Sequence, residues 1–465
     1  MASQDMRLER DSMGELEVPI NAYYGGNTRR AELNFPISKL RLGRSFIKAI
    51  GQIKQSAAVV NLDLDAIDDE IAQAIIASSQ RVIDGEFDDQ FVVDIFQTGS
   101  GTSTNMNANE VISNVAIESL GGKLGSRDPV HPNDHVNKGQ SSNDVFPSTI
   151  HLAAAGAIKD NLLPALKELE EALRAKSVEF WGVVKTGRTH LQDATPIRLG
   201  QEFLGYAGQL EFAGKRAEKA LAELSVLALG GTAVGTGIGM HPEFATRVIT
   251  RLRELTGLDL SETTNHFQAQ STLDGAVSAS GELKSIAVGM LKIANDLRWL
   301  GSGPRAGIGE IMLPEGQPGS SSMPGKVNPV IAESVAMVSA QVIGNDATIT
   351  IAGQSGNFEL NVMMPVAAHN LLESIDLLAT SAQNLARQCI NGLIATNKGP
   401  EMVMQGLAIC TALAPLIGYD AAAGIAHDAS ESGETIKQVA LRETDLTEEQ
   451  LDEVLEPLSM TEPSA

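Results

Sequence analysis

Apolar side chains recur at intervals of three and four residues through much of the chain. Leu283, Ile286, Met290, Ile293 and Leu297 form one such series. Because an α-helix turns once in about 3.6 residues, this spacing places the five side chains on one face of a helix. The other apolar stretches are Ile158–Leu173, Phe203–Leu224, Leu371–Cys389 and a fifth from about Val330 to Ile351. Apolar faces of this length predict long, near-parallel helices packed in a bundle, and hence an all-α fold.

Between these apolar stretches lie segments rich in Gly, Ser, Thr and Asn. Taken singly, each segment is most simply a connector or a helix cap. They are long for connections between helices, however, and they share many hydrogen-bond donors and few acidic groups. We therefore expect them to converge on one ligand. The segments are Thr98–Asn109, His131–Asp144, Thr186–Pro196, Leu229–Gly239 and Gly319–Pro329.

Composition narrows the classes of partner and of site. A chain of 465 residues predicts two or three domains, and its net charge of −23 argues against nucleic acid or an anionic membrane as a partner. The only cysteines are Cys389 and Cys410. We therefore expect no disulfide framework, no iron–sulfur cluster and a reducing, cytoplasmic location. No run of about 18 apolar residues predicts a membrane span, and the N-terminal residues lack the apolar core of a signal peptide.

The segment from Gly319 to Pro329 has the sequence G-S-S-S-M-P-G-K-V-N-P. It leads into a helix with Glu333 in its first turn, and the start of a helix offers unpaired backbone N–H groups and a partial positive charge. Lys326 and Asn328 add further donors, so the loop is suited to bind a carboxylate. The structural alternative is a flexible loop that contains a Pro-Gly turn.

Other polar segments supply hydroxyl and amide groups and one histidine. Thr189, His190 and Gln192 are suited to orient a water molecule, although a histidine in a polar loop is more often simply solvated. The remaining groups can cap helices or bind a small dicarboxylate. They are Ser100, Thr102, Ser141, Ser142 and Asn143.

The residues also allow two other kinds of site. His131, Asp134 and His135 could bind a metal ion, but their spacing is loose and no cysteine joins them. A Ser–His–Asp hydrolase would need a G-x-S-x-G turn between a strand and a helix, and the chain shows almost no strand pattern. We therefore expect no metal and no cofactor.

The polar segments resemble, nearly letter for letter, the signature regions of the fumarase–aspartase superfamily. The sequence at Gly319–Pro329 is similar to the superfamily signature, in which Ile often stands at the position of Ser322. The sequence G-R-T-H-L-Q-D-A-T-P at Gly187–Pro196 resembles class II fumarases, since aspartate ammonia-lyases carry Gln at the position of His190. The segments H-P-N-D-H-V-N, G-P-R-A-G-I-G-E-I and S-G-N-F-E-L-N-V extend the resemblance over nearly the whole chain.

This resemblance implies a metal-free class II fumarase, which interconverts fumarate and L-malate in the tricarboxylic acid cycle. It implies anti addition of water through an aci-carboxylate carbanion. It also implies three helical domains, at 1–140, 141–397 and 398–465. Five long helices from each of four chains would form a twenty-helix core in a homotetramer, with each active site built from three chains.

The resemblance further implies roles for single residues. Ser320 matches the catalytic base. Thr189 and His190 match the pair that positions the catalytic water, and Glu333 matches the acid that orients the histidine. Substrate-binding positions are matched by Ser100, Thr102, Ser141, Ser142, Asn143, Lys326 and Asn328. A second carboxylate site is matched by His131, Asn133 and Asp134. The usual basic residue of that second site has no direct counterpart, because Arg127 is displaced by one position.

Aspartate ammonia-lyase and argininosuccinate lyase are the alternatives within the superfamily. His190 disfavours the first, and the fumarase-like loops disfavour the second. A catalytically silent scaffold is a further alternative, because the superfamily includes structural proteins of the lens. A scaffold has no physical need to retain Ser320, Lys326 and Asn328 together with the histidine.

Overall fold

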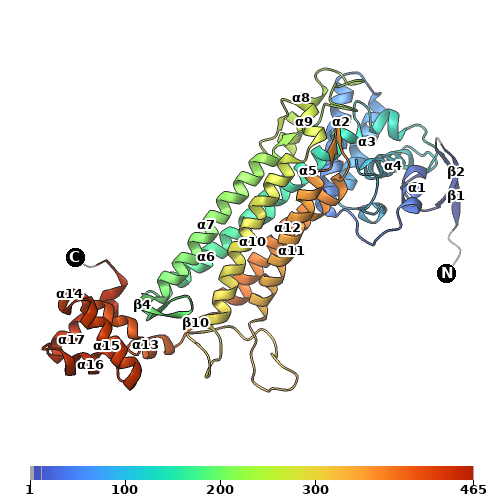
Figure 1. Ribbon diagram of the computed structural model, residues 1–465. Helices are drawn as coiled ribbons and strands as arrows, with labels where there is room; N and C mark the ends of the chain where they lie inside the picture. Colours follow the sequence, from blue (N-terminus) through green and yellow to red (C-terminus); the bar gives the residue numbers. More distant parts are fainter. Residues whose placement is uncertain (1–4, 12, 464–465) are drawn as a thin grey trace. The chain divides into compact units, whose positions relative to one another are not determined.

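The computed structural model describes residues 5–11 and 13–463. The chain folds into two compact units. The first comprises Met1–Pro164, Lys215–Ala287 and Ala340–Ala379, and the second comprises Ala165–Gly214, Val288–Ser339 and Thr380–Ala465. Four long helices contribute residues to both units and are labelled in Figure 1: α7 (Leu199–Leu224), α10 (Asp274–Leu300), α11 (Val330–Gly353) and α12 (Met364–Leu385).

The first unit contains the N-terminal elements. Its helices are α1 (Gly26–Asn34), α2 (Arg44–Asp63), α3 (Asp69–Ile83), α4 (Thr102–Ser119), α5 (Ser142–Ala157), α8 (Phe244–Thr256) and α9 (His266–Ser271). A 3-10 turn, η1 (Asp88–Gln90), and two π-helices, η2 (Pro132–Val136) and η3 (Ile158–Leu162), connect them. The strand pairs are β1 (Met6–Asp11) with β2 (Gly14–Pro19), β5 (Val226–Leu227) with β6 (Ser261–Glu262), and β8 (Gly356–Asn357) with β9 (Leu360–Asn361).

The second unit contains almost all of α6 (Leu163–Glu179) and the C-terminal elements. Two antiparallel strand pairs belong to it: β3 (Val184–Thr189) with β4 (Gln192–Arg198), and β7 (Ile311–Met312) with β10 (Ile394–Ala395). The remaining elements are η4 (Ala386–Ile390), α13 (Lys398–Val403), η5 (Leu407–Leu413), α14 (Ala414–Ile417), α15 (Tyr419–Ser432), α16 (Ile436–Glu443), α17 (Glu448–Val454) and η6 (Pro457–Thr461).

The apolar faces predicted from the spacing are buried. In α10, the five side chains from Leu283 to Leu297 are each at most 1% exposed. The series that continues through α12 into the π-helix η4 is equally buried, from Leu371 to Cys389. The prediction of a mostly helical protein with long helices is confirmed, and the five sheets found in residues 5–11 and 13–463 have two strands each.

Helix α11 differs from the expectation that the chain has no apolar stretch long enough to span a membrane. By length and composition alone α11 could do so, and it is the one such helix among the described residues; its mean hydropathy over an 18-residue window is 1.2. The sequence criterion of an unbroken apolar run missed it, because an average tolerates single polar residues. One of these, Asp346, accepts hydrogen bonds from Ser280 Oγ (2.8 Å) and Lys284 Nζ (2.6 Å), both on α10.

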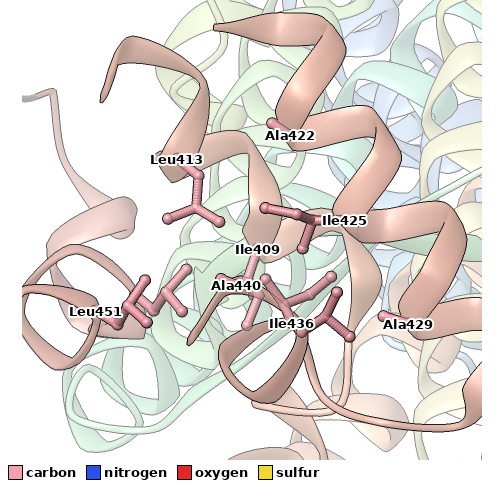
Figure 2. Close-up of a cluster of buried hydrophobic side chains, with 10 residues drawn as sticks. Ile409, Leu413, Ala422, Ile425, Ala429, Ile436, Ala440 and Leu451 are labelled. Carbon is pink, nitrogen blue, oxygen red and sulfur yellow. The ribbon is translucent and has the colours of Figure 1, made fainter. Parts of the chain in front are cut away.

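The C-terminal helices enclose a small core of their own in the second unit. Figure 2 shows apolar side chains from η5, α15, α16 and α17 directed toward one another, among them Leu413, Ile425, Ile436 and Leu451. The acidic composition after about residue 444 predicts that the last dozen residues are mobile. Within the described part of this tail, residues 457–461 form η6, where Thr461 accepts hydrogen bonds from the side chains of Arg198 (3.1 Å) and Gln201 (2.8 Å).

Candidate active site

Two polar segments meet where α4 and α5 begin. The hydroxyl oxygens of Ser100 and Thr102 lie 2.8 Å apart, and those of Thr102 and Ser142 lie 2.7 Å apart, although the last two residues are 40 positions apart in the chain. Gly101, between the first two, has φ +73°, and a Cβ there would lie 2.1 Å from the Phe146 ring. We call Ser100, Thr102 and Ser142 the hydroxyl cluster. It lies at two helix N-termini, where backbone N–H groups favour an anion.

The start of α5 is also a helix cap, as the structural alternative predicted. Ser141 Oγ accepts the backbone N–H of Asn143, while Asp144 Oδ1 accepts the backbone N–H of Ser141. Asn143 Nδ2 donates to the carbonyl oxygen of Ala233 at 2.8 Å. This last bond holds the start of α5 against the Gly-rich segment Leu229–Gly239, so a third polar segment lies beside the hydroxyl cluster.

The buried carboxylate of Asp144 makes the connection to that Gly-rich segment stronger. Its Oδ2 accepts backbone N–H bonds from Gly230 and Thr232, both at 3.0 Å. Burial raises the pKa of Asp144, while these bonds and the bond from Ser141 N–H oppose the rise by favouring the charged form.

The residues of the predicted second carboxylate site lie on and before one π-helix, η2. His131 Nδ1 accepts the backbone N–H groups of Asn133 (3.3 Å) and Asp134 (3.2 Å). Nδ1 also lies 3.2 Å from the Asp134 carboxylate. Asn133 and Asp134 are exposed. Within the described residues, no three His, Cys, Asp or Glu side chains gather closely enough to bind a metal ion.

Thr189 and His190 lie at the tip of a hairpin, and not in the irregular loop that the polar sequence suggested. Strands β3 and β4 pair Thr189 with Gln192, and the two residues between them, His190 and Leu191, have φ values of 58° and 60°. Positive φ at both positions is typical of a two-residue hairpin turn that usually contains Gly or Asn. The hairpin could not be predicted from the sequence, because neither Gly nor Asn stands at these two positions.

Buried charges fix the base of this hairpin. Glu310 accepts two hydrogen bonds from the Arg188 guanidinium, at 2.8 and 3.1 Å, and it lies 3.0 Å from Lys185 Nζ. Lys185 also donates to Glu202 Oε1 at 2.8 Å. The hairpin is therefore held firmly, while Thr189 and His190 at its tip are exposed.

The segment Gly319–Pro329 forms an exposed loop that closes on itself. Asn328 Nδ2 donates to the carbonyl oxygen of Gly319, and a Cβ at Gly319 would lie 2.0 Å from the carbonyl oxygen of Lys326. Ser320 Oγ accepts the backbone N–H of Ser322 (3.3 Å) and Met323 (3.1 Å). The loop thus presents a serine hydroxyl and two nitrogen-bearing side chains.

The structure brings together only some of the predicted site residues. The hydroxyl cluster is joined by direct contacts, as are the residues around η2. Between His190 and Glu333, in contrast, no hydrogen bond or ion pair forms within the described chain, and the Lys326 ammonium has no acidic partner there.

Sequence analysis also missed two residues, Lys54 and Asn137, that hydrogen bonds link to α4. Lys54 Nζ donates to Asn137 Oδ1, and that same oxygen accepts hydrogen bonds from the side chains of Asn105 and Asn109. The only sequence signal was a lysine inside the otherwise uncharged stretch A-I-G-Q-I-K-Q-S-A-A-V-V of α2.

Comparisons with known proteins identify the family. A lyase family matches residues 14–344, and a family described as the fumarase C C-terminus matches 409–462. The class II fumarate hydratase of Methylorubrum extorquens is 50% identical and covers 100% of this chain and 98% of that protein. The mitochondrial fumarate hydratase of Homo sapiens is 48% identical, over 100% of this chain and 91% of its own length.

A solved structure extends the likeness to the fold. The recombinant class II fumarase from Schistosoma mansoni superposes with a TM-score of 0.96 at 38% identity, over 98% of this chain and 99% of that one. The chain therefore belongs to the lyase family that contains the fumarases and, within it, to the class II fumarate hydratases.

Proposed function

We propose that the chain hydrates fumarate reversibly to L-malate by anti addition of water. The observation that carries the proposal is the hydroxyl cluster, in which two distant segments place three hydroxyl groups at the N-termini of α4 and α5. Neutral donors at helix N-termini suit a carboxylate and leave the reacting carbons free of competing charges. Membership in the family makes fumarate and malate the dicarboxylates concerned.

Ser320 is proposed as the base that removes the C3 proton of malate. The pair of electrons left behind extends into the neighbouring carboxylate, which becomes a doubly charged aci-carboxylate. Lys326 and Asn328 are the proposed donors to this group. Donors that meet charge only as it develops lower the barrier more than they tighten binding of the substrate. The same positive charge lowers the cost of forming a serine alkoxide.

The hairpin tip is proposed to act on the opposite face of the substrate. Thr189 and His190 would hold the departing hydroxide or, in reverse, the attacking water, and Glu333 would orient the histidine. The firm base of the hairpin at Arg188 and Glu310 supports this role, because a misplacement of about 1 Å can slow a reaction about 10²-fold.

We propose a homotetramer in which each active site draws residues from three chains. Helix α11 supports an extensive interface: only 39% of its apolar 18-residue window is buried within the single chain, and Met337 is 68% exposed. Val288 on α10 and Ile351 on α11 are also exposed apolar residues. A contact between His190 and Glu333 would then form between chains. The η2 residues are proposed as a second carboxylate site.

The proposed domains are those expected from the sequence, at 1–140, 141–397 and 398–465. The match at residues 409–462 falls within the third. A cytoplasmic location is proposed from the two free cysteines, Cys389 and Cys410.

The test of the function is direct. Purified protein is mixed with L-malate, and the ultraviolet absorbance of fumarate is followed, with L-aspartate and argininosuccinate as parallel substrates. We expect absorbance to grow with malate alone. Growth with aspartate or argininosuccinate, and none with malate, would overturn the proposal.

A further inference from the structure

Lys54 is a fully buried cation that the proposed chemistry does not use. Its side chain is 0% exposed within α2, between the core residues Ile53 and Ala57. Burying an ammonium group is costly unless hydrogen bonds and an opposite charge compensate. No ion pair involves Lys54 among the described residues, so its compensation comes from amide oxygens.

Two amide oxygens of one turn bind the Lys54 ammonium. Nζ lies 3.0 Å from Asn137 Oδ1 and 3.0 Å from Gln140 Oε1. Asn137 Oδ1 is the more crowded oxygen, because it also accepts Asn105 Nδ2 at 3.2 Å and Asn109 Nδ2 at 3.1 Å, both from α4. The turn from Val136 to Gln140 is thereby fastened to α2 and to α4.

This turn connects the two groups of proposed ligands in the first unit. It begins at Val136, the last residue of the π-helix η2, and ends one residue before Ser141, the cap of α5. Asn105 and Asn109 lie on α4, whose first residue is Thr102 of the hydroxyl cluster. A shift of the turn would therefore change how the starts of α4 and α5 face each other.

We propose that Lys54 is a positioning residue, whose ammonium group holds the Val136–Gln140 turn and so aligns the hydroxyl cluster for a substrate carboxylate. The inference rests on the proposed function, since it takes the cluster to be the carboxylate site. The positive charge of Lys54 contributes to holding the turn, in addition to the number of its hydrogen bonds. A hydrogen bond from a cation is roughly twice as strong as one from a neutral amine, and Asn137 Oδ1 is shared by three donors.

Because the pKa of Lys54 lies near neutral pH, its charge can be changed by a change of pH. Burial lowers its pKa to about 7, although the field of Asp144 opposes the fall. Asp144 on α5 is the charged group whose field raises the pKa of Lys54. Nearby elements carry two other titratable groups. Glu110 of α4 is bonded to the start of α1, and His135 of η2 has its own pKa lowered by burial. The ammonium form therefore predominates below about pH 7 and is lost above it.

The experiment measures calorimetric binding of succinate, a non-reacting dicarboxylate, between about pH 6 and pH 8.5. The proteins are the wild type, Lys54→Met, and the control Lys48→Met, which removes an exposed lysine six residues earlier on the same helix. We expect wild-type and control affinity to fall about tenfold as the pH rises. Lys54→Met should bind at least about tenfold more weakly at pH 6 and show no such fall. When the pH profile of Lys54→Met is subtracted from that of the wild type, the contributions of groups that titrate in both proteins cancel.

Gln140→Glu provides the second variant, in case Lys54→Met does not assemble. A carboxylate placed beside Lys54 raises the pKa of the ammonium, so the fall in affinity should move to a pH at least about one unit higher. An unmoved fall in this variant, or a Lys54→Met profile identical to the wild type, would overturn the inference. A wild type that binds no succinate at any pH would instead contradict the proposed carboxylate site, and with it the proposed function.

Discussion

The hydroxyl cluster and the Ser320 loop differ in how they are fixed: contacts between distant segments fix the cluster, whereas the Ser320 hydroxyl contacts its own loop. Ser100, Thr102 and Ser142 contact one another directly, at the starts of helices fastened by Asp144 and Lys54. The loop is exposed from residue 321 to 327, and the Ser320 hydroxyl is bonded only to its own loop backbone. The first region holds its hydroxyl groups in place for the carboxylate that we propose it binds. The second needs further groups around it before its serine can act as a base.

This contrast predicts that changes in the loop affect turnover and changes in the cluster affect binding. The largest effect is expected for Ser320→Ala, which removes the proposed base. We expect kcat to fall by about 10²–10⁴-fold, while succinate binds as before. The measurement is the initial rate of fumarate formation together with calorimetry, and Ser322→Ala in the same loop is the matched control. Lost succinate binding in a folded protein would make Ser320 a binding residue.

Thr102→Val should have a smaller effect, and it should weaken binding and leave turnover unchanged. It removes the central hydroxyl of the cluster with almost no change of volume, and a hydrogen bond to a charged group contributes about 1.5–3 kcal/mol. We therefore expect succinate affinity to fall about 10–100-fold. Thr98→Val, which alters an exposed hydroxyl that contacts Ser103, is the control. If kcat fell and affinity stayed constant, the division of roles between the two regions would be wrong.

Removal of metal should have no effect on either region. The proposed chemistry uses a serine, a histidine, a lysine and amides. Protein treated with a chelator and checked by elemental analysis should keep its rate of malate dehydration. A loss of activity that added iron restores would contradict the account.

The fold was predictable because its signal is repeated many times along the chain. Each long helix repeats its apolar positions over several turns, so single polar residues such as Asp346 do not hide the pattern. The hydroxyl cluster was predictable in composition but not in geometry. Nothing in the sequence states that Thr102 and Ser142 touch.

The parts that sequence reasoning missed have weak local signals. The hairpin tip at His190 and Leu191 adopts a conformation that its residues do not favour, and the surrounding ion pairs of Glu310 hold it there. Lys54 is buried against its usual preference, and groups from distant segments (Asn137, Gln140 and the field of Asp144) compensate. Both cases are local preferences overruled by contacts between distant segments.

The central claim is that the loop and the hairpin tip act on one substrate from different chains. Ser320→Ala and His190→Asn proteins test it most directly, since Asn tolerates the positive φ at position 190. Each protein alone should be nearly inactive. The two are denatured, mixed in equal amounts and refolded, and mass spectrometry verifies hybrid tetramers.

Random hybrids should recover roughly a quarter of the wild-type rate, because each site draws the two residues from different chains and both are intact in about one site in four. If one chain supplied both residues, no mixed tetramer could contain an intact site. Verified hybrids that remain as inactive as the two parent proteins would contradict the shared active site.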